Sequence, residues 1–398
     1  MADDEDLSPP DILLDAQPLG ISFHPQHDVV AVGLISGSVE LHSYASASTS
    51  RVMSLSYHTD SCRAIAFSAR GDSLYSASSD KSLCCIDQTG AAVWRAEGAH
   101  DEPINAMLVL DGQGAGDGGG DSSFRCDAFS GGAAAMASAS APAAVATADD
   151  EGVVKVWDVR QRPSVCAMEF NEHEDFVSDL ALASDGMTLL ATSGDATLSV
   201  MDLRHRKLVA RSEDQEDELM SVAILKRGRK VVCGTQNGLL HIFSWGQFGD
   251  MSDRMPGHPN SVDTVAKLDE STLVTGSSDG IIRIIQLQPH KLLGVVGDHD
   301  DLPIERLLFS RDGNLLGTLS HDDAVHFWDV RFLQEGDGGG NDDCGDAEDG
   351  DGDGMDDMDD MEDEDEDEGQ GVQGRDKGKK KSKAKGYHET SEDFFSDM

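Results

Sequence analysis

The sequence repeats with a period of about 43 residues, and this period limits the possible folds more than any other feature. Each copy has an apolar strand-like segment, a turn, a second apolar segment with small residues, a polar turn and a third apolar segment. The second turn falls at Ser36, Asp80, Glu151, Asp195, Asn237, Asp279 and Asp322, so successive copies are 44, 71, 44, 42, 42 and 43 residues apart. Seven copies of short strands predict an all-β protein in which each copy forms one unit.

One interval is about 28 residues longer than the period. The excess falls in residues 111–142, which are rich in Gly, Ala and Ser. Such a composition cannot bury enough apolar surface to offset the entropy lost on ordering. We therefore predict a flexible insertion between the first and second strands of the third repeat.

The third apolar segment ends in Trp-Asp in two copies, at Trp157-Asp158 and Trp328-Asp329. Together with the period, these dipeptides resemble the WD40 family, in which each repeat forms one blade of a β-propeller. The resemblance implies a seven-bladed propeller over residues 11–333. Repeats one and five are degenerate, because both lack the leading His and carry Ser36 and Asn237 in place of Asp.

The last repeat lacks an outer strand, because the chain turns into EGDGGGNDD directly after its third strand. The chain begins with a short apolar run, Ile12 to Leu14, that belongs to no repeat. We predict that this run supplies the missing strand and closes the ring, which also hides the sheet edges. Residues 1–10 are expected to be disordered.

A His precedes the turn Asp by 21 to 23 residues in four repeats: His58, His173, His258 and His299 precede Asp80, Asp195, Asp279 and Asp322. In WD40 families these two side chains meet at the blade edge, and Ser78, Ser193 or Ser277 would stand between them. The set imitates a hydrolase triad in composition. A catalytic site needs one such set, whereas in this chain the set recurs with the period of the repeats. We therefore predict that these residues form a fold-stabilising network and that the protein is not an enzyme.

Other signals for ligands are weak, and we expect no cofactor and no metal site. The glycine run GAGDGGGD lacks the G-K-[ST] of a phosphate-binding loop. The run from Asp349 spaces its carboxylates as a calcium loop does, but acidic low-complexity sequence produces such matches by chance. The seven cysteines show no C-x-x-C spacing and are interpreted as reduced thiols.

The charge and hydropathy of the chain limit the kinds of partner that it can have. The formal net charge is −44, and the 25 acidic and 7 basic residues from Phe332 to Met398 leave −26 for residues 1–331. This charge repels phosphate backbones, so direct nucleic-acid binding is not expected, whereas basic proteins are attracted. There is no basic signal peptide and no 18-residue apolar stretch, so we expect no membrane association and a monomeric nuclear protein, partly cytoplasmic.

Three repeats end their third strand in a related tetrapeptide. These are Trp157-Asp158-Val159-Arg160, Met201-Asp202-Leu203-Arg204 and Trp328-Asp329-Val330-Arg331. They resemble the WDxR box of WD40 proteins that dock on the adaptor of cullin-4 ubiquitin ligases. The resemblance implies docking roles for Asp158, Arg160, Asp329 and Arg331, and more weakly for Asp202 and Arg204, where Met replaces Trp. The alternative is that these pairs are purely structural.

Residues 334–398 are predicted to be a disordered tail. Glu335 to Glu368 contains 20 acidic residues, and Arg375 to Lys385 contains seven basic ones. Lys379, Lys380, Lys381, Lys383 and Lys385 form a candidate nuclear-import cluster. The terminal pair Phe394 and Phe395 is a candidate docking motif.

The combination of seven repeats, an acidic tract, a Lys cluster and a terminal FFSDM resembles the WD repeat-containing protein 55 family. Its members are associated with the nucleolus and ribosomal RNA production, and plant-type members also with cullin-4 adaptor docking. Two functions remain open: a substrate receptor on a cullin-4 ligase, and a ribosome-assembly scaffold that binds preribosomal factors or escorts basic ribosomal or histone proteins.

Overall fold

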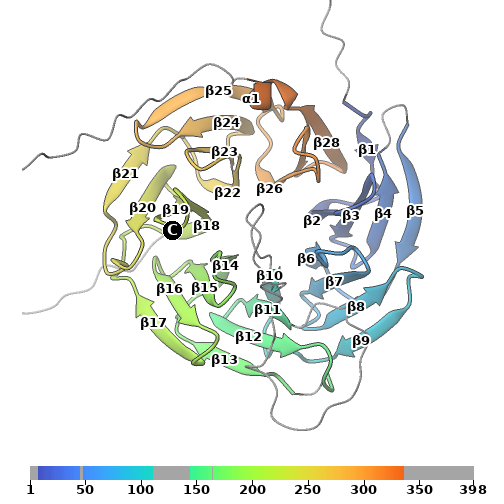
Figure 1. Cartoon of the computed structure of the whole chain (residues 1–398). Coiled ribbons are helices and arrows are strands. Elements are labelled where there is room, and N and C mark those ends of the chain that lie inside the picture. Colours follow the sequence, from blue (N-terminus) through green and yellow to red (C-terminus); the bar gives the residue numbers. More distant parts are fainter. Residues whose placement is uncertain (1–7, 45–47, 111–143, 164, 336–398) are drawn as a thin grey trace, which may run out of the picture. The chain divides into compact units, whose positions relative to one another are not determined.

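A computed structural model describes residues 8–44, 48–110, 144–163 and 165–335. Within these ranges the chain forms seven four-stranded antiparallel sheets, arranged radially around a central channel (Figure 1). The predicted all-β, seven-bladed propeller is confirmed. The chain runs from the innermost to the outermost strand of one blade and then enters the next.

The first three blades follow directly from the first three repeats. Blade 1 comprises β2 (Pro18–Phe23), β3 (Val29–Leu34), β4 (Val39–Ser43) and β5 (Ser50–Leu55). Blade 2 comprises β6 (Cys62–Phe67), β7 (Ser73–Ser78), β8 (Leu83–Asp87) and β9 (Ala92–Ala96). Blade 3 comprises β10 (Ile104–Val109), β11 (Ala144–Asp149), β12 (Val153–Asp158) and β13 (Met168–Asn171).

The next three blades have the same order of strands. Blade 4 comprises β14 (Val177–Leu182), β15 (Thr188–Ser193), β16 (Leu198–Asp202) and β17 (Lys207–Arg211). Blade 5 comprises β18 (Leu219–Leu225), β19 (Lys230–Thr235), β20 (Leu239–Ser244) and β21 (Asp253–Pro256). Blade 6 comprises β22 (Val262–Lys267), β23 (Thr272–Ser277), β24 (Ile281–Gln286) and β25 (Lys291–Asp298).

Blade 7 joins the two ends of the described chain. Its inner strands are β26 (Ile304–Phe309), β27 (Leu315–Ser320) and β28 (Ala324–Asp329), and its outer strand is β1 (Ile12–Leu13). Ile12 pairs with Val325 and Leu13 with Ala324, and the Leu14 amide donates to the Asp323 carbonyl at 2.8 Å. The predicted closure of the ring by Ile12 to Leu14 is therefore confirmed.

The core lies between neighbouring blades. Second strands are buried on both faces because blades flank them on both sides, and all six residues of β11 and β23 are buried. Outer strands such as β5 are largely exposed. Trp157 packs at the junction of blades 2 and 3 against Ala64, Leu83 and Ile104, as its apolar ring predicts.

Repeats one and five form complete four-stranded blades despite their degenerate sequences. β10 ends at Val109 and β11 begins at Ala144, so the predicted insertion stands between the first and second strands of blade 3, outside the described residues. After β28 the chain forms a five-residue helix, α1 (Arg331–Glu335), which the repeat pattern did not predict.

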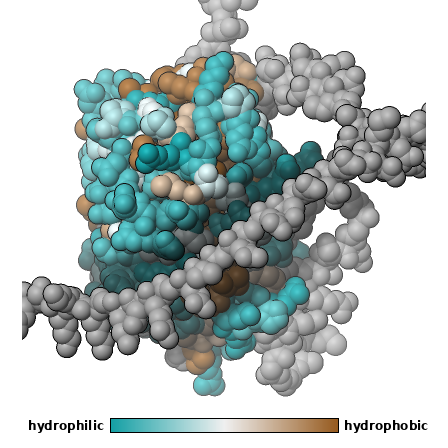
Figure 2. Space-filling view, turned by 90° about the vertical axis from the view of Figure 1, so that its left-hand side faces the viewer, coloured by the Kyte–Doolittle hydropathy of each residue, from teal (hydrophilic) through white to brown (hydrophobic). Residues whose placement is uncertain are grey.

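The side of the disc shown in Figure 2 is mostly hydrophilic, and its hydrophobic residues form separate groups. No helix in the described part of the chain has the length and apolar character needed to span a bilayer.

Candidate protein-docking face

The third strands of all blades run in the same direction, so their ends reach one face of the disc. The loops between first and second strands reach the same face, because Ala144 at the start of β11 pairs with Asp158 at the end of β12. We call this the exit face. The three tetrapeptides of the sequence analysis all end on it, and Leu110 and Ala144, the described residues on either side of 111–143, lie there too.

Blade 3 holds Arg160 in a fixed orientation on the exit face. Its Nε donates to Asp158 Oδ1 at 2.9 Å, and its Nη2 donates to Asp158 Oδ2 at 3.0 Å. The Arg160 amide and the Gln161 side chain also donate to this carboxylate, at 3.0 and 3.1 Å. The Asp158 side chain is 4% exposed and that of Arg160 is 45% exposed. A buried carboxylate thus orients an accessible guanidinium.

The carboxylate of Asp158 is ionised because of these donors. Burial by itself would raise its pKa, but the hydrogen bonds from Arg160 and Gln161 outweigh burial and hold the pKa below its usual range. The charge-assisted fork between Asp158 and Arg160 reduces the entropy that Arg160 would lose on binding a partner.

Blade 7 repeats the arrangement of blade 3. Arg331 Nε donates to Asp329 Oδ1 at 2.9 Å, its Nη2 contacts Oδ2, and its amide donates to Oδ1 at 3.1 Å. The Arg331 side chain is 42% exposed. In both blades the Trp of the motif donates to a Thr in the second strand: Trp157 to Thr147 at 2.8 Å and Trp328 to Thr318 at 2.9 Å.

Blade 4 departs from this pattern. Asp202 accepts from the amide and the Nδ1 of His205, at 2.9 and 2.6 Å, in place of an arginine fork. The hydrogen bond from His205 lowers the pKa of Asp202. Arg204 is exposed. Asp202 and Arg204 therefore lack the fork seen in blades 3 and 7, and their weaker docking role stays a prediction.

The ring separates the two arginine forks. Blades 3 and 4 are neighbours, so Arg160 and Arg204 lie on adjacent blades, whereas blades 1 and 2 stand between blade 7 and blade 3 (Figure 1). A partner that touches Arg160 and Arg331 together must therefore extend across the disc.

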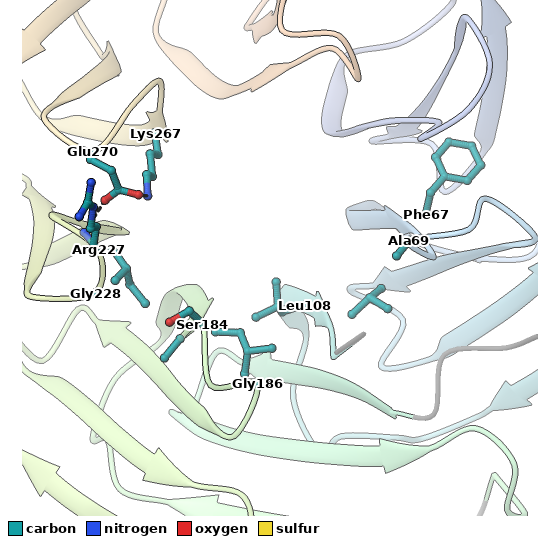
Figure 3. A pocket seen from close by; sticks show the side chains of 13 residues that line it. Phe67, Ala69, Leu108, Ser184, Gly186, Arg227, Gly228, Lys267 and Glu270 are labelled. Carbon is teal, nitrogen blue, oxygen red and sulfur yellow. Dashed lines mark hydrogen bonds and ion pairs between the residues drawn. The ribbon is translucent and has the colours of Figure 1, made fainter. Parts of the chain in front are cut away.

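A pocket of about 590 Å³ opens at the mouth of the channel on this same face. Arg227, Lys267 and Glu270 lie on one side of it, and Phe67 lies on the opposite side (Figure 3). Lys267 donates to Glu270 at 2.6 Å, and the Lys226 amide donates to the Glu270 carbonyl at 2.9 Å. Sequence reasoning missed this pocket, although the run KRGRK at 226–230 is an unusual basic cluster in an acidic body.

The repeated His residues build internal networks, as predicted. His58 contacts Ser82 at 2.9 Å and Ser76 at 2.8 Å and lies 3.5 Å from Asp80, and His173 contacts Asp195 at 3.2 Å. Each network lies inside its own blade. Linked hydrogen bonds of this kind stabilise one arrangement of the blade.

Two details of the predicted networks are wrong. Ser78, Ser193 and Ser277 do not bridge His to Asp; their hydroxyls donate to the carbonyls of Asp60, Asp175 and Asn260 and fasten the preceding loop. In blades 2 and 4 the bridging hydroxyls belong to Ser82 and Thr197, which lie two residues after the turn Asp and contact both the His and the Asp.

The predicted His–Asp hydrogen bond is also not formed by His258 and Asp279 in blade 6 or by His299 and Asp322 in blade 7, where His326 bonds Asp322, and it is displaced in blade 3. In blade 6, Arg283 takes both oxygens of Asp279, at 2.9 and 2.6 Å. In blade 3, His100 contacts Asp149 at 2.7 Å, and the aligned residue Glu151 is exposed. The turn of blade 3 is thus where the alignment predicts it, but the carboxylate that contacts the His is two residues before the aligned residue.

Two predicted sites lie outside the described residues. These are the nuclear-import cluster of Lys379, Lys380, Lys381, Lys383 and Lys385, and the terminal pair Phe394 and Phe395.

Comparison with known proteins gives the family. A family model described as WDR55 matches residues 132–333, and one described as "WD domain, G-beta repeat" matches residues 49–87. WD repeat-containing protein 55 of Arabidopsis thaliana is 41% identical over 329 residues, which are 82% of this chain and 84% of the relative. This chain belongs to the WD repeat-containing protein 55 family. The Dictyostelium discoideum homolog is 37% identical over 335 residues, 84% of this chain and 74% of its own.

The human member of the WD repeat-containing protein 55 family is 33% identical over 330 residues, 82% of this chain and 78% of the relative. The matched WD domain at residues 49–87 runs from β5 through β8, so one sequence repeat contains the outer strand of one blade and three strands of the next. This offset locks neighbouring blades together. Family membership makes the chain a WD40 scaffold, a class that acts in protein–protein interaction.

Proposed function

We propose that this member of the WD repeat-containing protein 55 family is a non-enzymatic nuclear scaffold that docks on the adaptor of a cullin-4 ubiquitin ligase through its exit face. The observation that carries the proposal is the fork at Arg160. Its guanidinium is 45% exposed and is oriented by a buried carboxylate. A planar guanidinium in a fixed orientation is suited to bind carboxylates or backbone carbonyls of a partner.

The fork of blade 3 is the centre of the proposed docking surface. It has Arg204 on the adjacent blade, and Ala144 at the start of β11 pairs with Asp158 beside it. Arg331 forms a second contact only with a partner that spans the disc. Binding of the adaptor should therefore depend more on Arg160 than on Arg331.

A pull-down with the purified cullin-4 adaptor tests this proposal. Arg160→Ala should lower the affinity about tenfold or more, the cost typical of losing a charge-assisted contact. Arg254→Ala is the matched control, because Arg254 is an exposed arginine on the outer strand β21. Equal binding by wild type, Arg160→Ala and Arg331→Ala, all with unchanged melting temperature, would refute adaptor docking through the forks.

We also propose a role in ribosome biogenesis and rRNA processing, with the nucleolus as the site of action. The strong negative charge favours basic partners such as ribosomal proteins over nucleic acid. The cluster of Lys379, Lys380, Lys381, Lys383 and Lys385 would direct nuclear import. This role does not depend on whether the arginine forks bind a partner or only stabilise the fold.

Localisation in cells separates the two parts of this proposal. Replacement of the five clustered lysines by Ala should move a fluorescently tagged chain from the nucleus to the cytoplasm. Arg160→Ala should leave the localisation unchanged. Co-purification of preribosomal proteins with the Arg160→Ala variant would support the scaffold role independently of the ligase.

A further inference from the structure

Blade 7 contains a cluster of metal-ligating side chains that the other described blades lack. His299 precedes β26, Asp322 lies in the turn between β27 and β28, and His326 lies on β28. One ligand atom from each residue lies within 4.8 Å of the other two. These loops belong to the face opposite the exit face, so this cluster is separate from the docking surface.

Each imidazole is oriented through the nitrogen that faces away from the cluster. His299 Nε2 contacts Thr318 Oγ1 at 2.8 Å, and His326 Nδ1 lies 3.0 Å from Asp11 Oδ2. The two rings are perpendicular, with centroids 4.7 Å apart. Histidine ligands of metal ions commonly have such a partner on the second nitrogen, which fixes the tautomer and the ring orientation.

The third member of the cluster has an unsatisfied acceptor. His326 Nε2 lies 2.7 Å from Asp322 Oδ2, but Asp322 Oδ1 is buried and has no hydrogen-bond donor among the described residues. A buried carboxylate oxygen without a donor destabilises the fold, because its hydration is lost and not replaced. A bound cation would remove this cost.

The neighbouring blade gives an internal comparison. Arg283 occupies in blade 6 the position that His326 occupies in blade 7, and its guanidinium satisfies both oxygens of Asp279. Blade 6 therefore carries a permanent cation beside the turn carboxylate. Blade 7 has an imidazole there, which can bind a metal ion as a neutral ligand.

We propose that His299, Asp322 and His326 bind one borderline-soft divalent metal ion, with Zn²⁺ the best fit, and with water in a fourth position. Two imidazoles and one carboxylate suit Zn²⁺, whereas Ca²⁺ and Mg²⁺ prefer sites built from oxygen alone. Tetrahedral coordination needs ligand atoms about 3.4 Å apart, at bonds of about 2.1 Å. The His326 side chain is 26% exposed and can make the remaining movement.

Metal binding should also stabilise the closure of the ring. His326 lies on β28, which pairs with β1, and its Nδ1 contacts Asp11 directly before β1. The ion would fix the ring of His326 and so strengthen its contact with Asp11.

The test uses the full chain after removal of metal with a chelator. Co²⁺ replaces Zn²⁺ as a spectroscopic probe, because four-coordinate Co²⁺ absorbs strongly in the visible range. We expect this absorption to appear on titration, to saturate near one equivalent, and to disappear when Zn²⁺ is added. Absence of sulfur-to-cobalt charge-transfer absorption would exclude the cysteines as ligands.

The matched variant is His326→Arg, which reproduces the arrangement of blade 6. It should abolish the visible absorption and weaken the tight Zn²⁺ binding at least tenfold. Zn²⁺ should raise the melting temperature of wild type and leave that of the variant unchanged. Diffuse binding of cations to the acidic residues after 335 is the same in both proteins and cancels in the comparison.

Two results would overturn the proposal. One is a wild-type Co²⁺ spectrum without the four-coordinate absorption. The other is identical Zn²⁺ binding and thermal shift in wild type and His326→Arg. Should His326→Arg fail to fold, His326→Gln serves in its place, and unchanged Co²⁺ absorption in that variant would equally refute the site.

Discussion

At the scale of single residues, a few buried hydroxyls decide whether the polar interior is satisfied. Thr147 Oγ1 accepts from Trp157 Nε1 at 2.8 Å and contacts His100 Nε2 at 2.7 Å, and His100 in turn contacts Asp149. Such a chain of hydrogen bonds specifies one arrangement of the blade, because every member needs its partners.

Removal of this hydroxyl should be costly. Thr147→Val keeps the shape of the side chain but leaves the indole N–H of Trp157 and a nitrogen of His100 without partners. We expect a loss of about 2–4 kcal/mol in the free energy of unfolding, measured by urea denaturation. Thr89→Val in an exposed turn is the control and should cost less than about 1 kcal/mol. Equal losses would show that the buried network contributes nothing specific.

Stability should depend on pH through the buried histidines. Burial, with a further contribution from the charge of Arg283, lowers the pKa of His258 to about 4, whereas unfolded His titrates near 6.5. Between pH 7 and pH 5.5 the unfolded chain takes up a proton at this residue and the folded chain does not. Stability should therefore fall as the pH falls, by about 1 kcal/mol from this residue.

His258→Gln tests this linkage. The variant is expected to be less stable overall, but its free energy of unfolding should fall about 1 kcal/mol less than that of wild type between pH 7 and pH 5.5. Denaturant unfolding at both pH values gives the comparison. Parallel pH curves for the two proteins would contradict the assignment.

At the scale of elements, closure depends on a strand of two residues. β1 is short, yet one side chain is buried and the other points away: Ile12 is 3% exposed and Leu13 is 83% exposed. Ile12 joins the cluster of Phe23, Val325 and Phe327 between blades 7 and 1. The strand therefore holds the ring through its buried side as well as through its backbone.

The two residues of β1 provide a matched pair. Ile12→Ala should cost about 2–4 kcal/mol, because it leaves a cavity at the closure. Leu13→Ala should change the stability by less than about 0.5 kcal/mol, because its side chain lies in solvent. Thermal or urea unfolding distinguishes the two. Similar effects of both substitutions would mean that β1 contributes only backbone pairing.

At the scale of the whole molecule, charge opposes compactness. Residues 1–331 carry a net charge of −26, and the full chain carries −44. Self-repulsion of this size is reduced when salt shortens the screening length, which is about 10 Å at 0.1 M.

The melting temperature should accordingly rise with ionic strength. We expect an increase between about 10 mM and about 200 mM NaCl, measured by scanning calorimetry, because screening stabilises the folded state of a highly charged chain more than the expanded unfolded state. The same increase in KCl would identify screening as the cause. A flat or falling melting temperature would show that attractive ion pairs such as Arg311–Asp28 dominate.

The sequence alone determined the number of blades, the closing strand and the positions of the exit-face arginines, because the repeat period and strand alternation are local properties. Only the tertiary structure decided which side chains meet. In blade 4 the Asp202 carboxylate bonds His205. In blade 6 the Asp279 carboxylate bonds Arg283 in place of His258. In blade 7, His326 and His299 both lie near Asp322. These choices depend on competition among neighbours in a packed blade. Equal spacing along the chain does not show which side chain contacts the carboxylate.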